Sequence, residues 1–380
     1  ERRAGRRAGS WCPIVSGTAG RLTGVLESIL LVGGKGTRLR PLTINHPKPM
    51  LPVAGVPFTE HQVAIARAAG VTRIALGTSY RAEVFSDYFG DGSNFGVALD
   101  YRVEDEPLGT GGAIRNAADA LTCGPDDPVV IFNGDILTGL DIRGLVAAWE
   151  KADADVALYL TRVEDPRAFG LVPTEGERVT AFLEKPQTPE EIVTDQINAG
   201  CYVFRRRVID EIPAGRPVSV ERETFPGLLA AGRVVVGHVD PGYWLDLGTP
   251  LAFARGSADI VQGRVHSPAL PGSVGDCLIL DGEVAGTCDG GTTVGRSAQV
   301  GQGSRVSGSV LFDGAMVGRD CVIEDSIIGA GAVIGDGTVL HGVVIGDGAA
   351  IGARNELRDG VRVWPGVELP ECGVRFSSDQ

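Results

Sequence analysis

The segment that decides the fold is residues 30–52, which read LLVGGKGTRLRPLTINHPKPMLP. The apolar run at residues 29–32 is typical of a buried strand. It ends at Gly33 and Gly34, and Gly36 follows two residues later. Glycines allow the backbone to bend sharply and to turn several N–H groups toward one point, as a bound phosphate requires.

Cationic side chains lie in the same segment, at Lys35, Arg38 and Lys48. Backbone donors combined with fixed positive charge suit a triphosphate. The glycine spacing, GGxG, fits neither the dinucleotide fingerprint GxGxxG nor the P-loop pattern GxxxxGK[ST]. The glycines alone would fit a tight surface turn equally well, so the longer motif carries the interpretation.

The rest of the chain up to about residue 262 alternates predicted strands and helices. Predicted strands cover residues 73–77, 96–103, 129–132, 156–160, 198–204 and 234–239, with a hairpin at 171–183. Predicted helices cover residues 59–69, 81–88, 109–121, 145–152 and 250–261. This order predicts an α/β fold with a Rossmann-like, mainly parallel sheet, in which ligands bind at the carboxyl ends of the strands.

From about Val294 the pattern changes to an aliphatic residue followed by glycine, repeated about every six residues, as in Val300-Gly301 and Ile334-Gly335. This repeat predicts a left-handed parallel β-helix, whose interior the aliphatic side chains fill. We expect a disordered or artefactual tail at 1–25, a catalytic domain at 26–262, a linker at 263–290 and the β-helix at 291–380.

The motif GGKGTRLRPLT together with PKPMLP resembles the sugar-phosphate nucleotidyltransferases. The resemblance is closest to the bacterial two-domain mannose-1-phosphate guanylyltransferases, and it covers the chain from about residue 26 onward. The other matching motifs are EPLGTGG, FNGD, FLEKP, NAGCYVF, SVERETFP and GYWLDLGTP. The resemblance implies attack of a sugar-1-phosphate oxygen on the α-phosphate of GTP, giving GDP-mannose and pyrophosphate.

The resemblance also implies site residues. Asp135 and Asp246 are the expected ligands of Mg²⁺, which prefers one or two carboxylates plus substrate oxygens and water. Arg38, Lys48 and Asp135 form the expected catalytic set, with Arg38 on the departing pyrophosphate and Lys48 on the α-phosphate and the sugar phosphate. Taken alone, either aspartate could be a helix cap or turn residue.

Two further groups follow from the resemblance. The expected nucleotide-binding residues are Leu31, Gly33, Gly34, Gly36, Thr37, Glu104, Gly109 and Thr110. The expected sugar-phosphate-binding residues are Asn133, Glu184, Lys185, Asn198 and Gly200. For Glu184 and Lys185, an exposed surface ion pair is an alternative explanation.

Glu104 carries an argument about the base that is separate from the resemblance. Guanine presents two adjacent donors, its ring N–H and its exocyclic amine, and an ionised carboxylate can accept from both. Thymine or uracil would place carbonyl oxygens against that carboxylate. Glu104 therefore favours GTP, although Asp105 and Glu106 beside it leave a solvated acidic turn as the alternative.

Three other functions remain open from the sequence. The nucleotide or sugar could differ, as in a glucose-1-phosphate thymidylyl-, uridylyl- or adenylyltransferase. Hexapeptide β-helices also occur in acyltransferases, but His341 is the only histidine within the repeat and no inserted loop surrounds it. A non-catalytic regulatory paralogue should have lost catalytic charges, whereas Arg38, Lys48, Asp135 and Asp246 are all present.

The composition limits the possible binding partners and the cellular compartment of the protein. The chain has 380 residues, enough for two domains, and a net charge of −13, which argues against general binding to nucleic acid or to anionic membranes. No apolar run approaches the ~20 residues of a membrane span. The 7 cysteines include no CxxC pair, which indicates reduced thiols and a cytoplasmic protein. We expect a homo-oligomer assembled through the β-helix.

Overall fold

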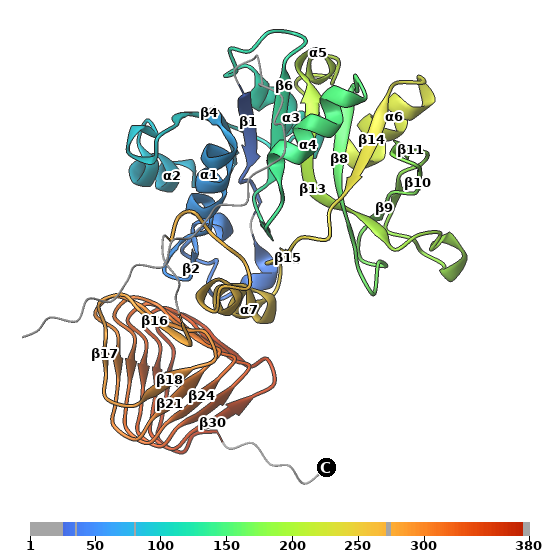
Figure 1. Ribbon diagram of the computed structural model, residues 1–380. Helices are drawn as coiled ribbons and strands as arrows, with labels where there is room; N and C mark the ends of the chain where they lie inside the picture. Colours follow the sequence, from blue (N-terminus) through green and yellow to red (C-terminus); the bar gives the residue numbers. More distant parts are fainter. Residues whose placement is uncertain (1–25, 35, 80, 271–274, 375–380) are drawn as a thin grey trace, which may run out of the picture.

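The computed structural model describes residues 26–34, 36–79, 81–270 and 275–374. The expected tail at 1–25 and the cation at Lys35 lie outside these residues. Figure 1 shows an α/β domain above a column of short stacked strands, with α7 between them. The helices are α1 (Phe58–Ala69), α2 (Ala82–Phe89), α3 (Gly109–Ala118), α4 (Ile142–Lys151), α5 (Arg206–Asp210), α6 (Phe225–Ala230) and α7 (Pro250–Val261).

The main sheet of the α/β domain has the strand order β10-β11-β14-β8-β13-β6-β1-β4-β5. Its long strands are β1 (Leu26–Leu31), β4 (Val71–Thr78), β5 (Ala98–Val103), β6 (Pro128–Asn133), β8 (Val156–Arg162), β13 (Gln196–Arg205) and β14 (Val235–Val239). The predicted hairpin consists of the nested pairs β9 (Gly170–Leu171) with β12 (Leu183–Glu184) and β10 (Thr174–Glu175) with β11 (Arg178–Val179). Two small ribbons are β2 (Pro52–Val53) with β3 (Val56–Pro57) and β7 (Ile136–Thr138) with β15 (Trp244–Asp246).

The predicted fold class is confirmed, with one difference in strand direction. β6, β1, β4 and β5 are parallel, and β14 is parallel to β8. β13 runs antiparallel to both β6 and β8, so the sheet is mixed. A hairpin precedes β13 rather than a crossover helix, and only a crossover would return the chain in the parallel direction.

Helices cover both faces of the sheet. One apolar core contains buried residues of α1, α2 and α4, and the other contains those of α3, α5 and α6. α3 ends at Ala118, earlier than predicted, because the next residues form i→i−3 bonds such as Ala120 N–H to Ala117 O. This three-layer packing buries both faces of the strands and leaves their ends free for polar side chains.

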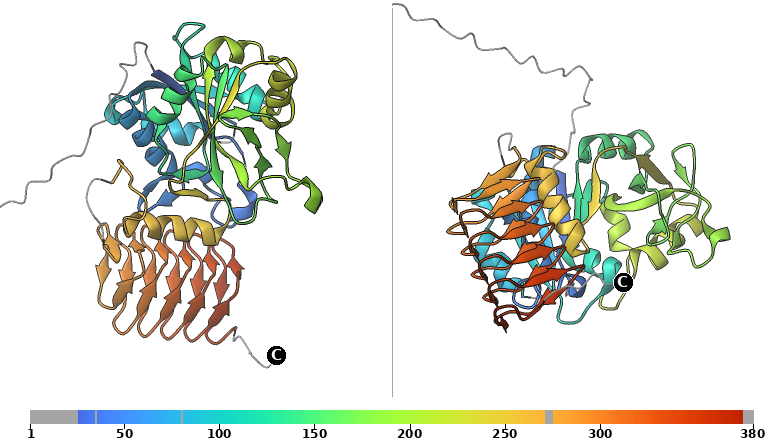
Figure 2. Two further views of the ribbon diagram at one scale, coloured as in Figure 1. Left: turned by 45° about the vertical axis from the view of Figure 1, so that its right-hand side comes forward. Right: turned by 90° about the horizontal axis from the view of Figure 1, so that it is seen from below.

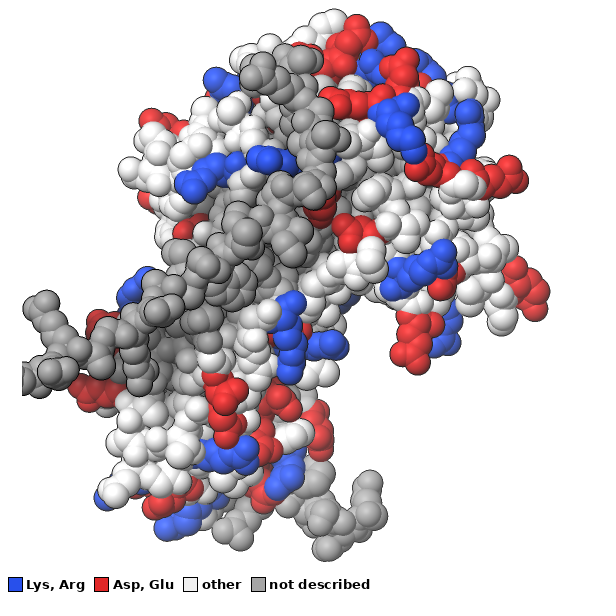
Figure 3. All heavy atoms as spheres, viewed as in Figure 1, with Lys and Arg blue, Asp and Glu red and all other residues white. Residues whose placement is uncertain are grey.

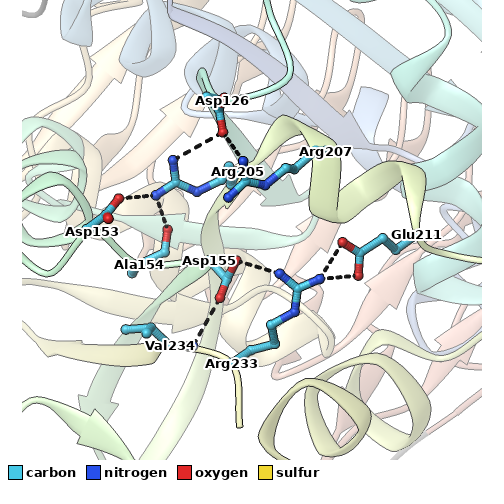
Figure 4. A network of polar contacts seen from close by, with 9 residues as sticks. All are labelled: Asp126, Asp153, Ala154, Asp155, Arg205, Arg207, Glu211, Arg233 and Val234. Atoms are coloured by element: carbon cyan, nitrogen blue, oxygen red, sulfur yellow. Dashed lines mark hydrogen bonds and ion pairs between the residues drawn. The ribbon is translucent and has the colours of Figure 1, made fainter. Parts of the chain in front are cut away.

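Ion pairs link the strand ends on the side of the sheet opposite the cleft described below (Figure 4). Arg205, at the end of β13, contacts Asp153, which precedes β8. Arg233, which precedes β14, bridges Asp155 and Glu211. These contacts join three neighbouring strands and the end of α5.

The second domain consists of three stacked parallel sheets, consistent with the expected left-handed β-helix (Figure 2). The docking sheet, as we call it, comprises β16 (Cys277–Ile279), β19 (Thr292–Val294), β22 (Val310–Leu311), β25 (Ile327–Ile328), β28 (Val344–Ile345) and β31 (Arg362–Val363). The second sheet comprises β17 (Glu283–Val284), β20 (Gln299–Val300), β23 (Met316–Val317), β26 (Val333–Ile334), β29 (Ala350–Ile351) and β32 (Glu368–Leu369). The third comprises β18 (Thr287–Asp289), β21 (Arg305–Ser307), β24 (Val322–Glu324), β27 (Val339–His341) and β30 (Glu356–Arg358).

The repeated aliphatic–glycine pairs have the predicted places. The aliphatic members, for example Val300, Ile334 and Ile351, are buried inside the β-helix. A Cβ on Gly301 would lie 2.3 Å from the carbonyl oxygen of Gly318 in the next coil, so only glycine fits there. The stack begins at Cys277, inside the region expected to be linker, because its first coil is filled by residues that lack the repeated pair: Cys277, Val284 and Cys288.

The two domains share an apolar core. α7 lies along the docking sheet (Figure 2), and Phe253 of α7 clusters with Val310, Ile327 and Val344. Ser257 of α7 also forms a buried hydrogen bond of 3.1 Å with Thr293. Burying each such aliphatic side chain contributes roughly 1.5–3 kcal/mol, so the β-helix is fixed against the α/β domain.

The surface carries mixed charge. On the face drawn in Figure 3, lysines and arginines alternate with aspartates and glutamates over both domains. Within the described residues, no helix combines the length and the apolar character that a membrane crossing needs.

Candidate active site

A cleft of about 760 Å³ opens at the carboxyl ends of β1, β4 and β6. Twelve of the residues singled out from the sequence line it: Leu31, Gly33, Gly34, Gly36, Thr37, Arg38, Lys48, Glu104, Gly109, Thr110, Asn133 and Asp135. The lining also includes Ser79 and Gly248, which the sequence analysis did not assign to the site. Two strand-end loops and the glycine-rich segment therefore surround one hollow, as expected for ligand binding in such sheets.

The glycine-rich segment makes a tight bend after β1. Gly34 and Gly36 have φ values of 104° and 55°, a region that side chains with a Cβ disfavour. A Cβ on Gly36 would also lie 2.8 Å from the Cβ of Lys48. The hydroxyl of Thr43 donates to the carbonyl of Gly36 at 2.8 Å, and the short helix η1 (Thr37–Leu39) follows. The bend thus brings Gly33, Gly34 and Gly36 to the wall of the cleft, where the Gly34 N–H donates to the Ser79 hydroxyl at 3.4 Å.

Lys48, Asp135 and Asp246 form the charged centre of the site. Nζ of Lys48 donates to Oδ2 of Asp135 at 3.0 Å and lies 3.9 Å from Oδ1 of Asp246. The two aspartates meet because β15 pairs antiparallel with β7, and the Leu247 N–H donates to the Asp135 carbonyl at 3.0 Å. A pair of carboxylates far apart in the sequence therefore shares one cation.

The surroundings of Asp246 suit a divalent cation. Burial, and next the negative charge of Asp135, raises the pKa of the Asp246 carboxyl, while Lys48 and Arg38 oppose this shift. Its Oδ1 is buried and accepts no hydrogen bond. Among the described residues, no three or more histidines, cysteines and acidic residues gather as a metal site. Two carboxylates with an unused oxygen nevertheless fit Mg²⁺, which takes its other ligands from substrate and water.

Arg38 reaches the cleft from η1. Its guanidinium packs against Gly248, where a Cβ would lie 2.8 Å from Nη2. Gly248 belongs to the same motif as Asp246, and the missing side chain leaves room for the arginine. The cation therefore lies near the carboxylates while remaining largely exposed to solvent.

Glu104 accepts a hydrogen bond from within the protein, in addition to the contact with the base that the sequence predicts. Its Oε2 accepts a hydrogen bond of 2.9 Å from the N–H of Leu108, which closes the turn before α3. Burial raises the pKa of Glu104, although that hydrogen bond opposes the shift. A carboxylate has about four acceptor positions, so this bond leaves acceptors available to a ligand.

Behind Gly109 and Thr110 lies a helical turn that the sequence reasoning left without a role. The Thr110 hydroxyl donates to Oε2 of Glu221 at 2.7 Å and accepts from the Val220 N–H at 2.9 Å. Glu221 belongs to η5 (Val220–Thr224), within the motif SVERETFP. Its negative charge, after burial, raises the pKa of Glu184. The motif SVERETFP was the sequence signal that could have pointed to this turn.

Of the five residues expected to bind the sugar phosphate, Asn133 alone is among the residues that line the cleft. Asn133 lines the cleft, and Gly200 packs against it, with a Cβ position 2.9 Å from Nδ2 of Asn133. The side-chain amide of Asn198 donates to the Tyr202 hydroxyl at 2.9 Å. Glu184 and Lys185 lie on the hairpin outside the cleft lining, and their ion pair spans 3.8 Å.

Comparisons with known proteins agree with this geometry. Residues 27–263 match the family described as "Nucleotidyl transferase", and residues 283–375 match the "GMPPB C-terminal domain". A mannose-1-phosphate guanylyltransferase of Mycobacterium tuberculosis is 56% identical over 93% of this chain and 98% of its own length. Mannose-1-phosphate guanylyltransferase 1 of Arabidopsis thaliana is 32% identical over 75% of this chain and 79% of its own.

Solved structures extend the comparison. HddC from Yersinia pseudotuberculosis, also solved as a complex with GMP-PN, is 28% identical in both structures. The HddC structure without that ligand has a TM-score of 0.53, and the match covers 62% of this chain and 99% of the HddC chain. A putative glucose-1-phosphate thymidylyltransferase from Bacillus anthracis is 26% identical, with a TM-score of 0.55 over 62% of this chain and 94% of its own. The cleft, the motifs and these matches together show that the chain belongs to the nucleotidyl transferase family and is a nucleotidyltransferase.

Proposed function

We propose that the protein transfers the guanylyl group of GTP to mannose 1-phosphate and releases pyrophosphate. The observation that carries this proposal is the cluster of Lys48, Asp135 and Asp246 beside a glycine-rich bend. It combines two carboxylates for a metal, a cation and backbone donors, which are the groups that joining two phosphates requires. The name of the Mycobacterium tuberculosis relative supports the choice of substrates.

The reaction needs positioning and charge neutralisation more than proton transfer. An oxygen of the sugar phosphate attacks the α-phosphorus, the bond to the bridging oxygen breaks, and pyrophosphate leaves with the electron pair. The nucleophile is already ionised at neutral pH, so no general base is required. Mg²⁺ held by Asp135 and Asp246 would neutralise phosphate charge. Lys48 binds the two phosphates being joined, and Arg38 binds the departing pyrophosphate.

For the base, Glu104 is the proposed acceptor of the two guanine donors. Its position in the cleft beside Gly109 and Thr110 supports this role. The Yersinia pseudotuberculosis relative was solved with a guanine nucleotide analogue, which supports GTP over the pyrimidine nucleotides. A thymidylyl-, uridylyl- or adenylyltransferase remains the alternative, since the Bacillus anthracis relative is named for thymidylyl transfer.

We place the reaction in the cytoplasm. The described cysteines are all free thiols, as expected in a reducing compartment: Cys123, Cys201, Cys277, Cys288, Cys321 and Cys372. GTP and mannose 1-phosphate are the proposed partners, without nucleic acid or membrane. Acyl transfer has less support, because His341 is an exposed residue at the end of β27.

Pyrophosphate release measured over a grid of nucleotides and sugar phosphates tests the function. The full chain should show its highest kcat/KM with GTP and mannose 1-phosphate. A chelator should abolish this release and Mg²⁺ should restore it, because the triphosphate charge must be neutralised. A higher kcat/KM with dTTP and glucose 1-phosphate would support the alternative instead. No release with any pair would overturn the proposal.

Asp246→Asn should lower kcat/KM by about a hundredfold or more, because a mispositioned metal forfeits several kcal/mol. Its pKa is raised in the folded protein, so the ionised carboxylate disfavours folding above that pKa. At neutral pH this variant should therefore keep or raise the thermal midpoint.

Asp135→Asn should lower both activity and midpoint, because it removes the closer partner of Lys48. Near-normal turnover at low Mg²⁺ would show that the mutated residue is not a ligand.

Glu104→Gln should narrow the preference for GTP over UTP or dTTP by about tenfold or more, equivalent to about 1–3 kcal/mol for a charged hydrogen bond. The glutamine oxygen can still accept from the Leu108 N–H, so the turn should persist. Glu106→Gln is the matched control, because Glu106 is exposed and outside the cleft lining. The measurement is kcat/KM for each nucleotide in the wild type and in both variants. An unchanged preference for GTP in Glu104→Gln would show that Glu104 does not contact the base.

We further propose that a second copy of this chain covers the outer row of the second sheet. Met316 and Val333 are paired in register there and are 42% and 37% exposed, and Ala350 follows in the row. Contiguous exposed apolar side chains favour association. Met316→Glu with Val333→Glu should therefore dissociate the oligomer in sedimentation experiments, whereas Val322→Glu on the third sheet should not. A wild-type chain that sediments as a monomer at micromolar concentration would contradict this.

A further inference from the structure

The docking sheet presents one outward-facing row toward the α/β domain. The register aligns its members in the order Leu278, Thr293, Val310, Ile327, Val344 and Arg362. Thr293, Val310, Ile327 and Val344 are at most 2% exposed, and the aliphatic members pack in the shared core. The row ends in Arg362, which is exposed and lies outside the shared apolar core.

Arg362 forms hydrogen bonds with the glycine-rich segment of the α/β domain. Its Nη1 donates hydrogen bonds of 2.8 Å to the carbonyl oxygens of both Arg38 and Arg40. These carbonyls lie within and just after η1, whose own bonds are Leu39 N–H to Gly36 O and Arg40 N–H to Thr37 O. A helical turn this short has little stability of its own, and a cation at its C-terminal carbonyls stabilises it.

A second contact from the β-helix reaches the same segment a few residues later. Nε2 of His46 lies 3.4 Å from Oδ2 of Asp347, which follows β28. The other oxygen of Asp347 accepts from the Ala330 N–H at 3.0 Å, so its carboxylate is fixed within the stack. The segment between η1 and Lys48 is thus held at two points by the β-helix.

The backbone of Arg38 is held on one side while its side chain enters the cleft on the other. Its guanidinium packs against Gly248 beside Asp246, as described above. A shift of the Arg38 carbonyl would therefore move the guanidinium relative to the carboxylates. Misplacement of a phosphate-binding group by about 1 Å can cost a hundredfold in rate.

We propose that Arg362 is a positioning residue of the active site, which fixes η1 so that Arg38 stays aligned with the departing pyrophosphate. The β-helix is then part of the catalytic unit and not only a structural appendage. This inference rests on the proposed function, because that function gives Arg38 its role. Arg362 itself contacts neither substrate.

The test compares Arg362→Leu, Arg362→Lys and the control Arg319→Leu in the full chain. Because Arg362 is exposed and outside the apolar core, Arg362→Leu should nearly keep the thermal midpoint while lowering kcat by about tenfold to a hundredfold, with a smaller change in KM for GTP. Lysine keeps a charged donor for the carbonyls and should restore most of kcat. Arg319 pairs with Asp336 on the outside of the β-helix, so its substitution should leave kcat unchanged.

Amide hydrogen exchange gives a readout that does not need turnover. Peptides covering residues 37–44 should exchange faster in Arg362→Leu than in the wild type or in Arg319→Leu. Unchanged kcat and unchanged exchange would overturn the inference, and so would a loss of kcat that accompanies a lower midpoint and faster exchange throughout the chain. If the wild type releases no pyrophosphate, the proposed function fails separately, and the exchange of residues 37–44 alone decides whether Arg362 anchors this segment.

Discussion

The site depends on one short pairing, β7 with β15, which returns the chain to the edge of the sheet and sets Asp246 beside Asp135. Burial raises the pKa of the Asp246 carboxyl, and the negative charge of Asp135 beside it raises this pKa further. The pairing persists because it is fixed on both sides: the Leu247 N–H donates to the Asp135 carbonyl, and the Trp244 indole donates to the Ala199 carbonyl at 3.0 Å. Lys48 lies close to both carboxylates and offsets part of their repulsion, and the proposed metal would offset the rest.

How far the sequence predicts this arrangement depends on the range of the interactions. The glycine bend, the helices and the interior of the β-helix follow from local rules, namely backbone freedom at Gly36, periodicity and the aliphatic repeat at residues such as Ile334. The direction of β13 does not, because an apolar strand reads the same whether its neighbours are parallel or antiparallel. The outward row of the docking sheet was also missed, since Val310 and Ile327 face another domain whose position no local pattern encodes.

The candidate site shows the same division. Its residue types were visible as motifs, but the motifs do not say which atoms are already used. Glu104 closes the turn at Leu108 as well as facing the cleft, so a single carboxylate serves the backbone and remains available to a ligand. Thr110, expected to contact nucleotide, directs its hydroxyl toward Glu221. Such satisfied contacts hold the cleft wall in place, and only coordinates reveal them.

A bound nucleotide does not depend on a β-helix in every similar structure. The Yersinia pseudotuberculosis relative matches over 99% of its own chain while covering 62% of this one, so it binds GMP-PN without a counterpart for the remaining residues. In this chain the catalytic domain has an additional contact, in which Arg362 of the β-helix donates to the backbone carbonyls of Arg38 and Arg40. Because the acceptors are backbone atoms, a change of side chain at residue 38 or 40 would leave them in place. A contact to the backbone leaves the side chain of Arg38 free for the ligand. The β-helix thus provides hydrogen-bond donors to a helical turn of the catalytic domain that is only three residues long.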